Sequence, residues 1–371
     1  MPAATSASTS GLTVALIFGG RSSEHSISCI SAAAVWEALE EAGHRVIPVA
    51  MTPSAGLVAY DHRPADLRAV QLPVVQRGDR TVHLPADPTV HGLLIDGEPM
   101  HVDVVFPVLH GPWGEDGTIQ GVCELAGVPY VGSGVLAAAL CMDKITLKQV
   151  LQATGVPVMP WVAVTDAVWE SDREGVIARI GELGPIVFVK PSRAGSSMGI
   201  TRVDLSSGEE GSLIDAIETA RGHDPRVIVE QAAAGAREIE CGVRQLPDGG
   251  VYASRCAQIV VRPGFDFYDF DAKYLADGAE LLVPAPMSEE LHQSIGELAR
   301  EAFAATGCEG LARVDFFVAD DSQIVVNEVN TMPGFTPISM YPRMWEESGV
   351  PYAELVDSLV REAHARRAGL R

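Results

Sequence analysis

The chain has 371 residues, with 47% hydrophobic residues, 20% charged residues and a formal net charge of -22 at pH 7. This length allows two or three domains with large buried cores. The acidic balance disfavours nucleic acids and anionic membranes as partners, because polyphosphate binding depends mainly on Lys and Arg. Any phosphate-binding site must therefore be a local exception.

Composition also indicates the cellular setting. Residues 1–10 are small and polar, without a basic start or an apolar run, so we expect a disordered tail on a cytoplasmic protein. No stretch has the length of a membrane span. The six cysteines show no Cys-x-x-Cys pair and no regular spacing, which predicts reduced, buried thiols rather than disulfides or a metal site.

The N-terminal part predicts a β-α-β unit. Apolar residues 12–18 form a strand that ends at two glycines, residues 28–42 form a helix, and residues 45–50 form a second strand. Residues 52–100 are rich in Pro and Gly, so irregular structure or short hairpins are expected. A buried strand at 102–108, a helix at 118–126 and a short strand at 128–131 follow.

The rest of the chain predicts alternating helices and strands. The expected helices cover residues 135–153, 211–220 and 289–306; the expected strands cover 186–189, 199–203, 227–230, 238–243 and 253–261, with a loop at 263–277. These patterns predict a mixed α/β and α+β fold with three domains. They are a doubly wound domain at 12–132, an α+β domain at 133–228 and a larger antiparallel domain at 229–371.

Two apolar runs near the C-terminus, residues 311–318 and 323–330, carry polar residues at every second position. Strand side chains alternate between faces, so the polar residues of each run share one face. The short polar segment between the runs predicts a hairpin. The four polar residues concerned are Arg313, Asp315, Glu328 and Asn330.

If the turn centres on residues 321–322, Asp315 lies opposite Glu328, and Arg313 lies opposite Asn330. Facing carboxylates repel each other, and burying them without compensation costs on the order of several kcal/mol. A divalent cation removes this conflict, and oxygen ligands suit Mg2+ bound together with phosphates. A polar hairpin that is open to water is the alternative.

Two glycine-rich segments have competing interpretations. Residues 130–137 match the G-x-G-x-x-A dinucleotide pattern, but residues 144–164 contain no acidic residue, which makes an NAD-dependent dehydrogenase a poor second hypothesis. Residues 190–199 follow a strand and could wrap phosphate with N–H groups and hydroxyls, with Lys190 supplying charge. An ordinary Gly/Ser hairpin is the alternative there, and the Walker pattern is absent.

Polar residues also follow two predicted strands of the N-terminal domain. Glu24 and His110 lie at strand ends, where open α/β sheets bind ligands, so Glu24 could pair with a substrate ammonium. A first-turn helix acid and a structural histidine are the alternatives. Further along, residues 265–274 mix aromatic and charged side chains, which is typical of a lid or of an acidic surface loop.

Taken in order, these motifs resemble the D-alanine:D-alanine ligase family of the ATP-grasp superfamily, from residue 14 to about residue 359. The segments that carry the resemblance are residues 18–25, 110–121, 142–144, 189–199, 268–274 and 327–336. The resemblance implies an ATP-grasp fold and the ATP-dependent joining of two D-alanines for peptidoglycan synthesis. It also implies a homodimer, as is usual in the family.

The resemblance implies a role for each matching residue. The nucleotide site would contain Lys144, Lys190, Glu230, Glu238, Phe267 and Lys273. Two Mg2+ ions, replaceable by Mn2+, would be held by Asp315, Glu328 and Asn330, and activation by a monovalent cation is left open. The D-alanines would contact Glu24, His110, Ser339 and Met340. Catalysis would involve Arg313, the Gly334 N–H, and a network of Ser196 and Tyr274 with Glu24.

Three functions remain open at this stage. A D-alanine:D-alanine ligase is favoured over a sister ligase that makes D-alanyl-D-lactate or D-alanyl-D-serine, and Tyr274 favours an amine as nucleophile. A nucleotide-binding protein without ligase activity is disfavoured, because it has no use for Arg313 beside metal ligands. Ser26 departs from the family, where many members have Glu, and this weakens any prediction about hydrogen bonds behind Glu24.

Overall fold

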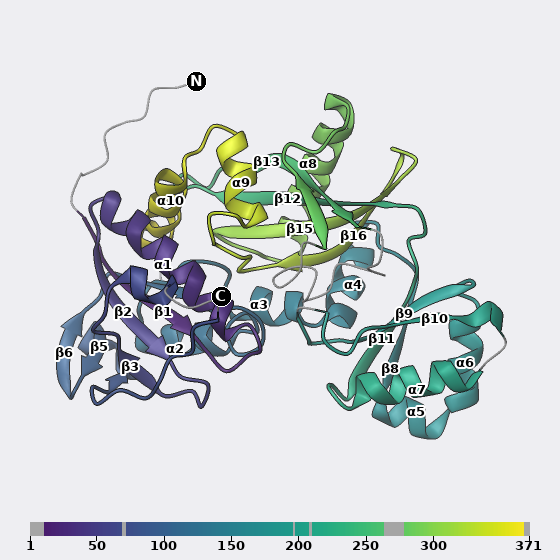
Figure 1. Ribbon diagram of the computed structural model, residues 1–371, viewed down its shortest axis with the longest axis horizontal. Helices are drawn as coiled ribbons and strands as arrows, with labels where there is room; N and C mark the ends of the chain where they lie inside the picture. The colour runs from purple at the N-terminus through teal and green to yellow at the C-terminus, as the bar shows by residue number, and fades with distance from the viewer. Residues whose placement is uncertain (1–10, 69–71, 196, 208–209, 263–277, 367–371) are drawn as a thin grey trace.

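The computed structural model describes residues 11–68, 72–195, 197–207, 210–262 and 278–366, and Figure 1 shows three sheet-containing parts that follow one another in sequence. Within these ranges, no helix has both the length and the apolar character needed to cross a bilayer. All six cysteines are free and buried, as expected from their spacing.

The N-terminal part contains a four-stranded sheet with the order β3-β2-β1-β7. Its strands are β1 (Thr13–Gly19), β2 (Arg45–Met51), β3 (Leu57–Ala59) and β7 (Val104–Val108). β1 pairs in parallel with β2 and β7, and β3 is an antiparallel edge strand. Helix α1 (His25–Glu41) connects β1 to β2, which confirms the predicted β-α-β unit.

Both faces of this sheet are covered. Val14, Leu16 and Phe18 of β1 point into one core, and Ala15 and Ile17 point into another, as strand alternation requires. The first core contains α1 and α10 (Tyr352–Ala365), and the second contains α2 (Thr118–Ala126). Each fully buried Leu, Val or Phe contributes about 1.5 to 3 kcal/mol.

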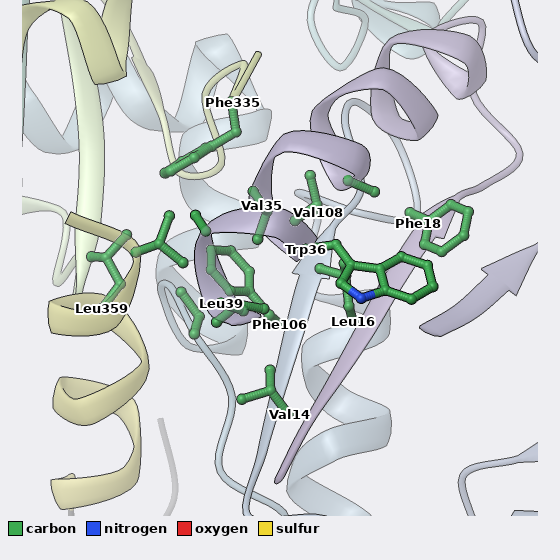
Figure 2. Close-up of a cluster of buried hydrophobic side chains, with 14 of the residues drawn as sticks. Val14, Leu16, Phe18, Val35, Trp36, Leu39, Phe106, Val108, Phe335 and Leu359 are labelled. Atoms are coloured by element: carbon green, nitrogen blue, oxygen red, sulfur yellow. The ribbon is translucent and has the colours of Figure 1, made fainter. Parts of the chain in front are cut away.

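The first core also draws on residues far along the chain. Figure 2 shows Phe335 and Leu359 beside Val35 and Leu39 of α1 and Phe106 of β7. Phe335 is fully buried, and its ring meets the Phe106 ring edge-on at 6.0 Å. The C-terminal part therefore helps to complete the N-terminal core.

Residues 52–100 contain short elements, in agreement with the prediction of short hairpins. These are η1 (Pro64–Arg68), β4 (Val82–His83), η2 (Pro88–Val90), β5 (Gly92–Ile95) and β6 (Glu98–His101). The last three strands form a small antiparallel sheet. The strand predicted at 128–131 is reduced to a single parallel bridge between Tyr130 and Val105.

The helix predicted at 135–153 is wrong as a single element. The structure has α3 (Val135–Met142) and α4 (Lys144–Ala153), separated by Asp143 in an extended conformation. The Asp143 carboxylate accepts a hydrogen bond from the Thr146 N–H at 3.0 Å and so caps α4. This cap places Lys144 at the first position of the new helix.

The central part is an antiparallel sheet with the order β10-β9-β11-β8. Its strands are β8 (Trp161–Thr165), β9 (Ile186–Pro191), β10 (Thr201–Asp204) and β11 (Arg226–Gln231). The helical elements here are α5 (Asp166–Ser171), α6 (Arg173–Gly181), η3 (Leu205–Ser207) and α7 (Glu210–Arg221). The pairing of β9 with β10 confirms the predicted hairpin, whereas β8, α5 and α6 were not predicted.

The C-terminal part is a five-stranded antiparallel sheet with the order β14-β13-β12-β15-β16. Its strands are β12 (Arg237–Gln245), β13 (Val251–Val261), β14 (Ala279–Leu282), β15 (Leu311–Ala319) and β16 (Gln323–Asn330). Its helices are α8 (Glu289–Ala305) and α9 (Met340–Glu347), while α10 packs against α1. β14, α9 and α10 were not predicted.

The β15–β16 hairpin confirms the predicted pairing. Arg313 lies opposite Asn330, and Asp315 lies opposite Glu328. The turn is one residue longer than expected, because Ala319 pairs with Gln323, but a bulge next to Asp315 restores the register. The two carboxylates therefore face each other as the alternation required.

Candidate active site

The three parts of the molecule meet around a cavity of about 820 Å3. It is lined by every predicted site residue that lies in the described ranges. These are Glu24, His110, Lys144, Lys190, Glu230, Glu238, Arg313, Asp315, Glu328, Asn330, Gly334, Ser339 and Met340. The remaining predicted residues, Ser196, Phe267, Lys273 and Tyr274, lie outside the described residues.

One end of the cavity holds a buried carboxylate between two lysines. Lys190, at the end of β9, donates a hydrogen bond to Glu230 of β11 at 2.7 Å. Lys148 of α4, which is 0% exposed, places its Nζ 3.3 Å from the other oxygen of Glu230. Burial alone would raise the pKa of Glu230, but the two lysines lower it to about 2. Glu230 therefore stays ionised.

Lys144 connects this end of the cavity to the hairpin. It begins α4 one helical turn before Lys148, so both side chains leave the same face of the helix. Its Nζ donates to the Ala194 carbonyl at 2.9 Å and lies 3.8 Å from Glu328 Oε2. The ammonium thus lies between the glycine-rich segment and the carboxylates of the hairpin.

In the hairpin, Arg313 forms a two-point pair with Asp315. Its Nε and Nη2 donate to Oδ1 and Oδ2 of Asp315, both at 2.7 Å, and Asn330 donates to Oδ2 at 3.0 Å. Glu240 of β12 lies 3.4 Å from the same guanidinium. Burial would lower the pKa of Arg313, but Asp315 and Glu240 raise it well above its ordinary value. The guanidinium is therefore a fixed positive charge at the cavity wall.

The other end of the cavity carries two carboxylates without a lysine between them. Glu24 immediately precedes α1. Gly111 and Gly195 lie close against its carboxylate: a Cβ atom added to either glycine would lie 2.8 Å or 3.1 Å, respectively, from Glu24 Oε2. Glu115 accepts hydrogen bonds from the N–H groups of Gly111 at 2.6 Å and Met332 at 3.4 Å. Burial and the nearby charge of Glu24 raise the pKa of Glu115 to about 8. This end is acidic: Arg313 lowers the pKa of Glu115, but by less than burial and Glu24 raise it.

His110 and Ser339 hold the segment that closes this end. The Nδ1 of His110 lies 3.1 Å from the Met332 carbonyl, and burial lowers the pKa of the ring. Ser339 Oγ lies 2.7 Å from Thr336 Oγ1 and accepts the Thr336 N–H at 3.1 Å. The cavity wall here runs from the end of β16 to the start of α9.

Three residues of the site were not predicted from the sequence. Lys148 could have been noticed as the residue four positions after Lys144, on the same helical face. Glu115 lies inside the 110–121 motif, but nothing in a strand or helix period singles it out. Glu240 shares a face of β12 with Glu238, and only the observed pairing of β12 with β15 shows its place beside Arg313.

The fold and the cavity together define the ATP-grasp class of ligases. An antiparallel central sheet and a larger C-terminal sheet enclose the cavity, which has lysines at one end and a carboxylate hairpin along its wall. Residues 13–133 match the family described as D-ala D-ala ligase N-terminus, and residues 150–361 match D-ala D-ala ligase C-terminus. The chain belongs to the D-alanine–D-alanine ligase family.

Individual relatives agree with this assignment. The chain is 49% identical to the D-alanine–D-alanine ligase of Nocardia farcinica, over 98% of this chain and 100% of that protein. It is 50% identical to that of Mycobacterium tuberculosis, over 96% of each chain. Among solved structures it is similar to the VanG D-Ala:D-Ser ligase of Enterococcus faecalis (TM-score 0.82, 34% identity, 95% of this chain and 99% of that chain). It is also similar to the D-alanine-D-alanine ligase of Coxiella burnetii (TM-score 0.81, 31% identity, 95% and 94%).

Proposed function

We propose that the chain uses ATP to join two molecules of D-alanine into D-alanyl-D-alanine, a peptidoglycan precursor. The family membership supports this activity. The observation that carries it to this site is the division of one cavity into an end where a carboxylate is paired with lysines and an end where two carboxylates repel each other. Such a cavity can accept a polyphosphate at one end and an ammonium at the other.

ATP would occupy the end with the lysines. Glu230 is ionised and buried, and its Oε1 makes an ion pair with Lys148 but no hydrogen bond of normal geometry. That oxygen can accept a hydrogen bond from the amino group of adenine. Glu238 would contact the ribose, and Lys144 and Lys190 would contact phosphates or base.

The hairpin would hold Mg2+. The donors are two carboxylates and one amide, and no group of three or more His, Cys, Asp or Glu residues is placed to hold a metal within the described part of the chain. Asp315, Glu328 and Asn330 therefore suit a hard ion that takes its other ligands from phosphates and water. When bound, Mg2+ would neutralise charge on the transferring phosphoryl group.

The first D-alanine would place its ammonium at Glu24, with His110 beside it. Its carboxylate oxygen attacks the γ-phosphorus of ATP, ADP leaves, and an acyl phosphate forms. Arg313 would stabilise the charge that develops on the phosphoryl oxygens. The protein positions the reactants and excludes water, and it supplies no nucleophile of its own.

The second D-alanine would bind its carboxylate at Ser339 and Met340. Its nitrogen, after losing a proton, attacks the acyl carbon, and phosphate leaves. The backbone N–H of Gly334 would donate to the oxygen of the tetrahedral intermediate. Ser196 and Tyr274 would be partners of Glu24. Phe267 and Lys273 would contact the nucleotide.

A panel of second substrates tests this proposal. Phosphate release and product formation should be measured with ATP, Mg2+ and D-alanine, and then with D-serine or D-lactate as the second substrate. D-alanyl-D-alanine should be the main product at neutral pH. A preference for D-serine would assign the chain to the activity named for the VanG structure, and ATP binding without any ligation would reject the proposal.

Location and assembly are further proposals that follow from the family resemblance. We expect a cytoplasmic homodimer that is activated by Mg2+ or Mn2+. Light scattering of the purified protein tests the dimer. Titration of activity with K+ at constant ionic strength tests whether a monovalent cation activates the enzyme.

A further inference from the structure

The segment from Thr331 to Phe335 directly follows β16 on the way to α9 and carries Gly334 at the cavity wall. Gly334 itself has no hydrogen-bond partner for its N–H among the described residues. Pro333, directly before it, has a fixed φ and no N–H. The direction of the Gly334 N–H therefore depends on how the neighbouring residues are held.

On one side of Gly334, both backbone groups of Met332 are held by the N-terminal part. The Met332 carbonyl lies 3.1 Å from His110 Nδ1, and the Met332 N–H donates to Glu115 at 3.4 Å. The Met332 side chain is 4% exposed and belongs to the same core as α1. This residue is fixed at three points.

On the other side, Phe335 is held in the same manner. Its N–H donates to Ser31 Oγ of α1 at 3.4 Å, and its carbonyl accepts a hydrogen bond from the Tyr352 hydroxyl. Its ring is buried in the N-terminal core (Figure 2). The ring also packs against Tyr341 at 5.4 Å.

Ser31 and His110 join these two anchors into one chain of hydrogen bonds. A carbonyl can only accept, so His110 Nδ1 carries the proton that it donates to Met332. The neutral ring then has an unprotonated Nε2, which lies 3.2 Å from Ser31 Oγ. The Ser31 hydroxyl donates to this nitrogen and accepts from the Phe335 N–H. Each hydrogen bond in this series therefore has one defined donor and one defined acceptor.

We propose that Ser31 is a positioning residue for the ligation reaction: its hydroxyl links the Phe335 N–H to His110, and this link fixes the direction of the Gly334 N–H toward the reacting carbonyl oxygen. The inference rests on the proposed role of Gly334. Ser31 does not line the cavity, and it is fully buried. It acts only through the segment that it holds.

The expected effect follows from the sensitivity of catalysis to geometry. An oxyanion donor must lie within about 2.7 to 3.1 Å of the developing charge, and a displacement of about 1 Å can cost about a hundredfold in rate. Loss of the Ser31 hydroxyl releases one anchor and leaves the others. We therefore expect kcat to fall by about tenfold to a hundredfold while the KM values for ATP and D-alanine stay within about twofold.

The experiment compares Ser31→Ala with two further variants, Ser31→Thr and Ser31→Val. The Thr and Val side chains have the same shape as each other and differ in that only Thr carries a hydroxyl. Steady-state kinetics should be measured together with inhibition by a phosphinate analogue of the dipeptide in the presence of ATP. Thr should retain most of kcat, whereas Ala and Val should lose it, and the inhibitor should weaken by the same factor as kcat. If Ser31→Ala does not fold, the Thr and Val pair still decides.

Ser28→Ala is the control for loss of a buried hydroxyl from the same helix. Ser28 Oγ bonds to the Val108 carbonyl and to the Gly19 N–H at 2.8 Å, away from the segment. It should lose thermal stability without the split between kcat and KM. Equal kcat in the Thr and Val variants would overturn the proposal. An unmodified protein without ligase activity would reject the proposed function instead.

Discussion

The two ends of the cavity bury carboxylates in opposite electrostatic settings. At the end proposed for the nucleotide, Glu230 has two lysines within hydrogen-bonding or ion-pair distance, and its pKa is lowered to about 2. At the end proposed for the amino acids, burial and the charge of Glu24 raise the pKa of Glu115 to about 8. Both carboxylates line the same cavity. In the sequence they are two glutamates, and nothing there distinguishes their electrostatic settings.

The difference indicates what each end is built to receive. A carboxylate that is already neutralised by internal cations can offer a lone pair to a neutral adenine without needing a charged partner. The Glu24–Glu115 pair has no lysine partner, and the repulsion between its two carboxylates favours any cation that enters, such as the ammonium of an amino acid. The charges of the protein therefore support the proposed placement of a nucleotide at one end and an ammonium at the other.

Removal of Lys148 should have the largest effect on this contrast. Lys148→Met leaves Glu230 buried with only one cation, and breaking a buried ion pair costs about 3 to 5 kcal/mol. The free energy of unfolding, measured by urea titration, should fall by this amount, and ATP affinity measured by calorimetry should fall with it. The double variant Lys148→Met/Glu230→Gln should recover most of the stability. A single variant as stable as the unmodified protein would show that Lys148 does not compensate Glu230.

Removal of Arg313, which lines the cavity, should affect rate rather than binding. Loss of one donor to a developing negative charge costs about 2.7 to 4 kcal/mol, or about a hundredfold to a thousandfold in kcat. Arg313→Ala should show this loss with a small change in the KM for ATP. Arg313→Lys keeps the charge but not the two-point geometry, so it should recover little. A rise in KM alone would make Arg313 a ground-state contact.

Glu24→Gln should sharpen the contrast from the amino acid end. A hydrogen bond to a charged group contributes about 1.5 to 3 kcal/mol, so the KM for D-alanine should rise by about tenfold to a hundredfold. The KM for ATP should stay unchanged, because the nucleotide end keeps its own cations. Steady-state kinetics with each substrate varied in turn makes this measurement, and equal changes in both KM values would contradict the division of the cavity.

Glu115→Gln should have the smallest effect and should depend on pH. The folded-state pKa of about 8 lies above the ordinary value of 4.5, so the folded protein retains a proton that the unfolded chain has lost. Stability therefore falls as the pH rises from about 4.5 to about 8. Gln removes this dependence, and Tm should rise by a few degrees at pH 8 but hardly at pH 5. Thermal melts across this range test the sign, and a uniform shift at all pH values would contradict it.

Periodicity was sufficient to predict the hairpin, because both strands have one buried face, and a slip of one residue would bury the wrong side chains. The pairing of Asp315 with Glu328 was therefore confirmed although the turn is longer than expected. The break at Asp143 was missed for a different reason. Its cap competes with a continuous helix, and contacts with Ser192 and Arg226, distant in sequence, favour the capped form.

The unpredicted site residues share this dependence on distant contacts. Lys148 becomes important only where β11 brings Glu230 against α4, and Glu115 only where the segment after β16 reaches the N-terminal part. The other predicted site residues in the described ranges all line one cavity. Motif resemblance could predict them because several lie inside the motif segments themselves, such as Glu24, His110 and Glu328. Ser196, Phe267, Lys273 and Tyr274 remain predictions.

The N-terminal core contains Phe335 and Leu359, which lie more than two hundred residues after α1 in the chain. During synthesis, α1 and β7 therefore leave the ribosome with an apolar surface that nothing made so far can cover. The N-terminal part is synthesised first, but its core is completely packed only after the C-terminal residues have been added. A fragment that ends near residue 132 would expose Val35, Leu39 and Phe106 to water. Such a fragment should aggregate unless residues 331–366 are supplied as a separate chain.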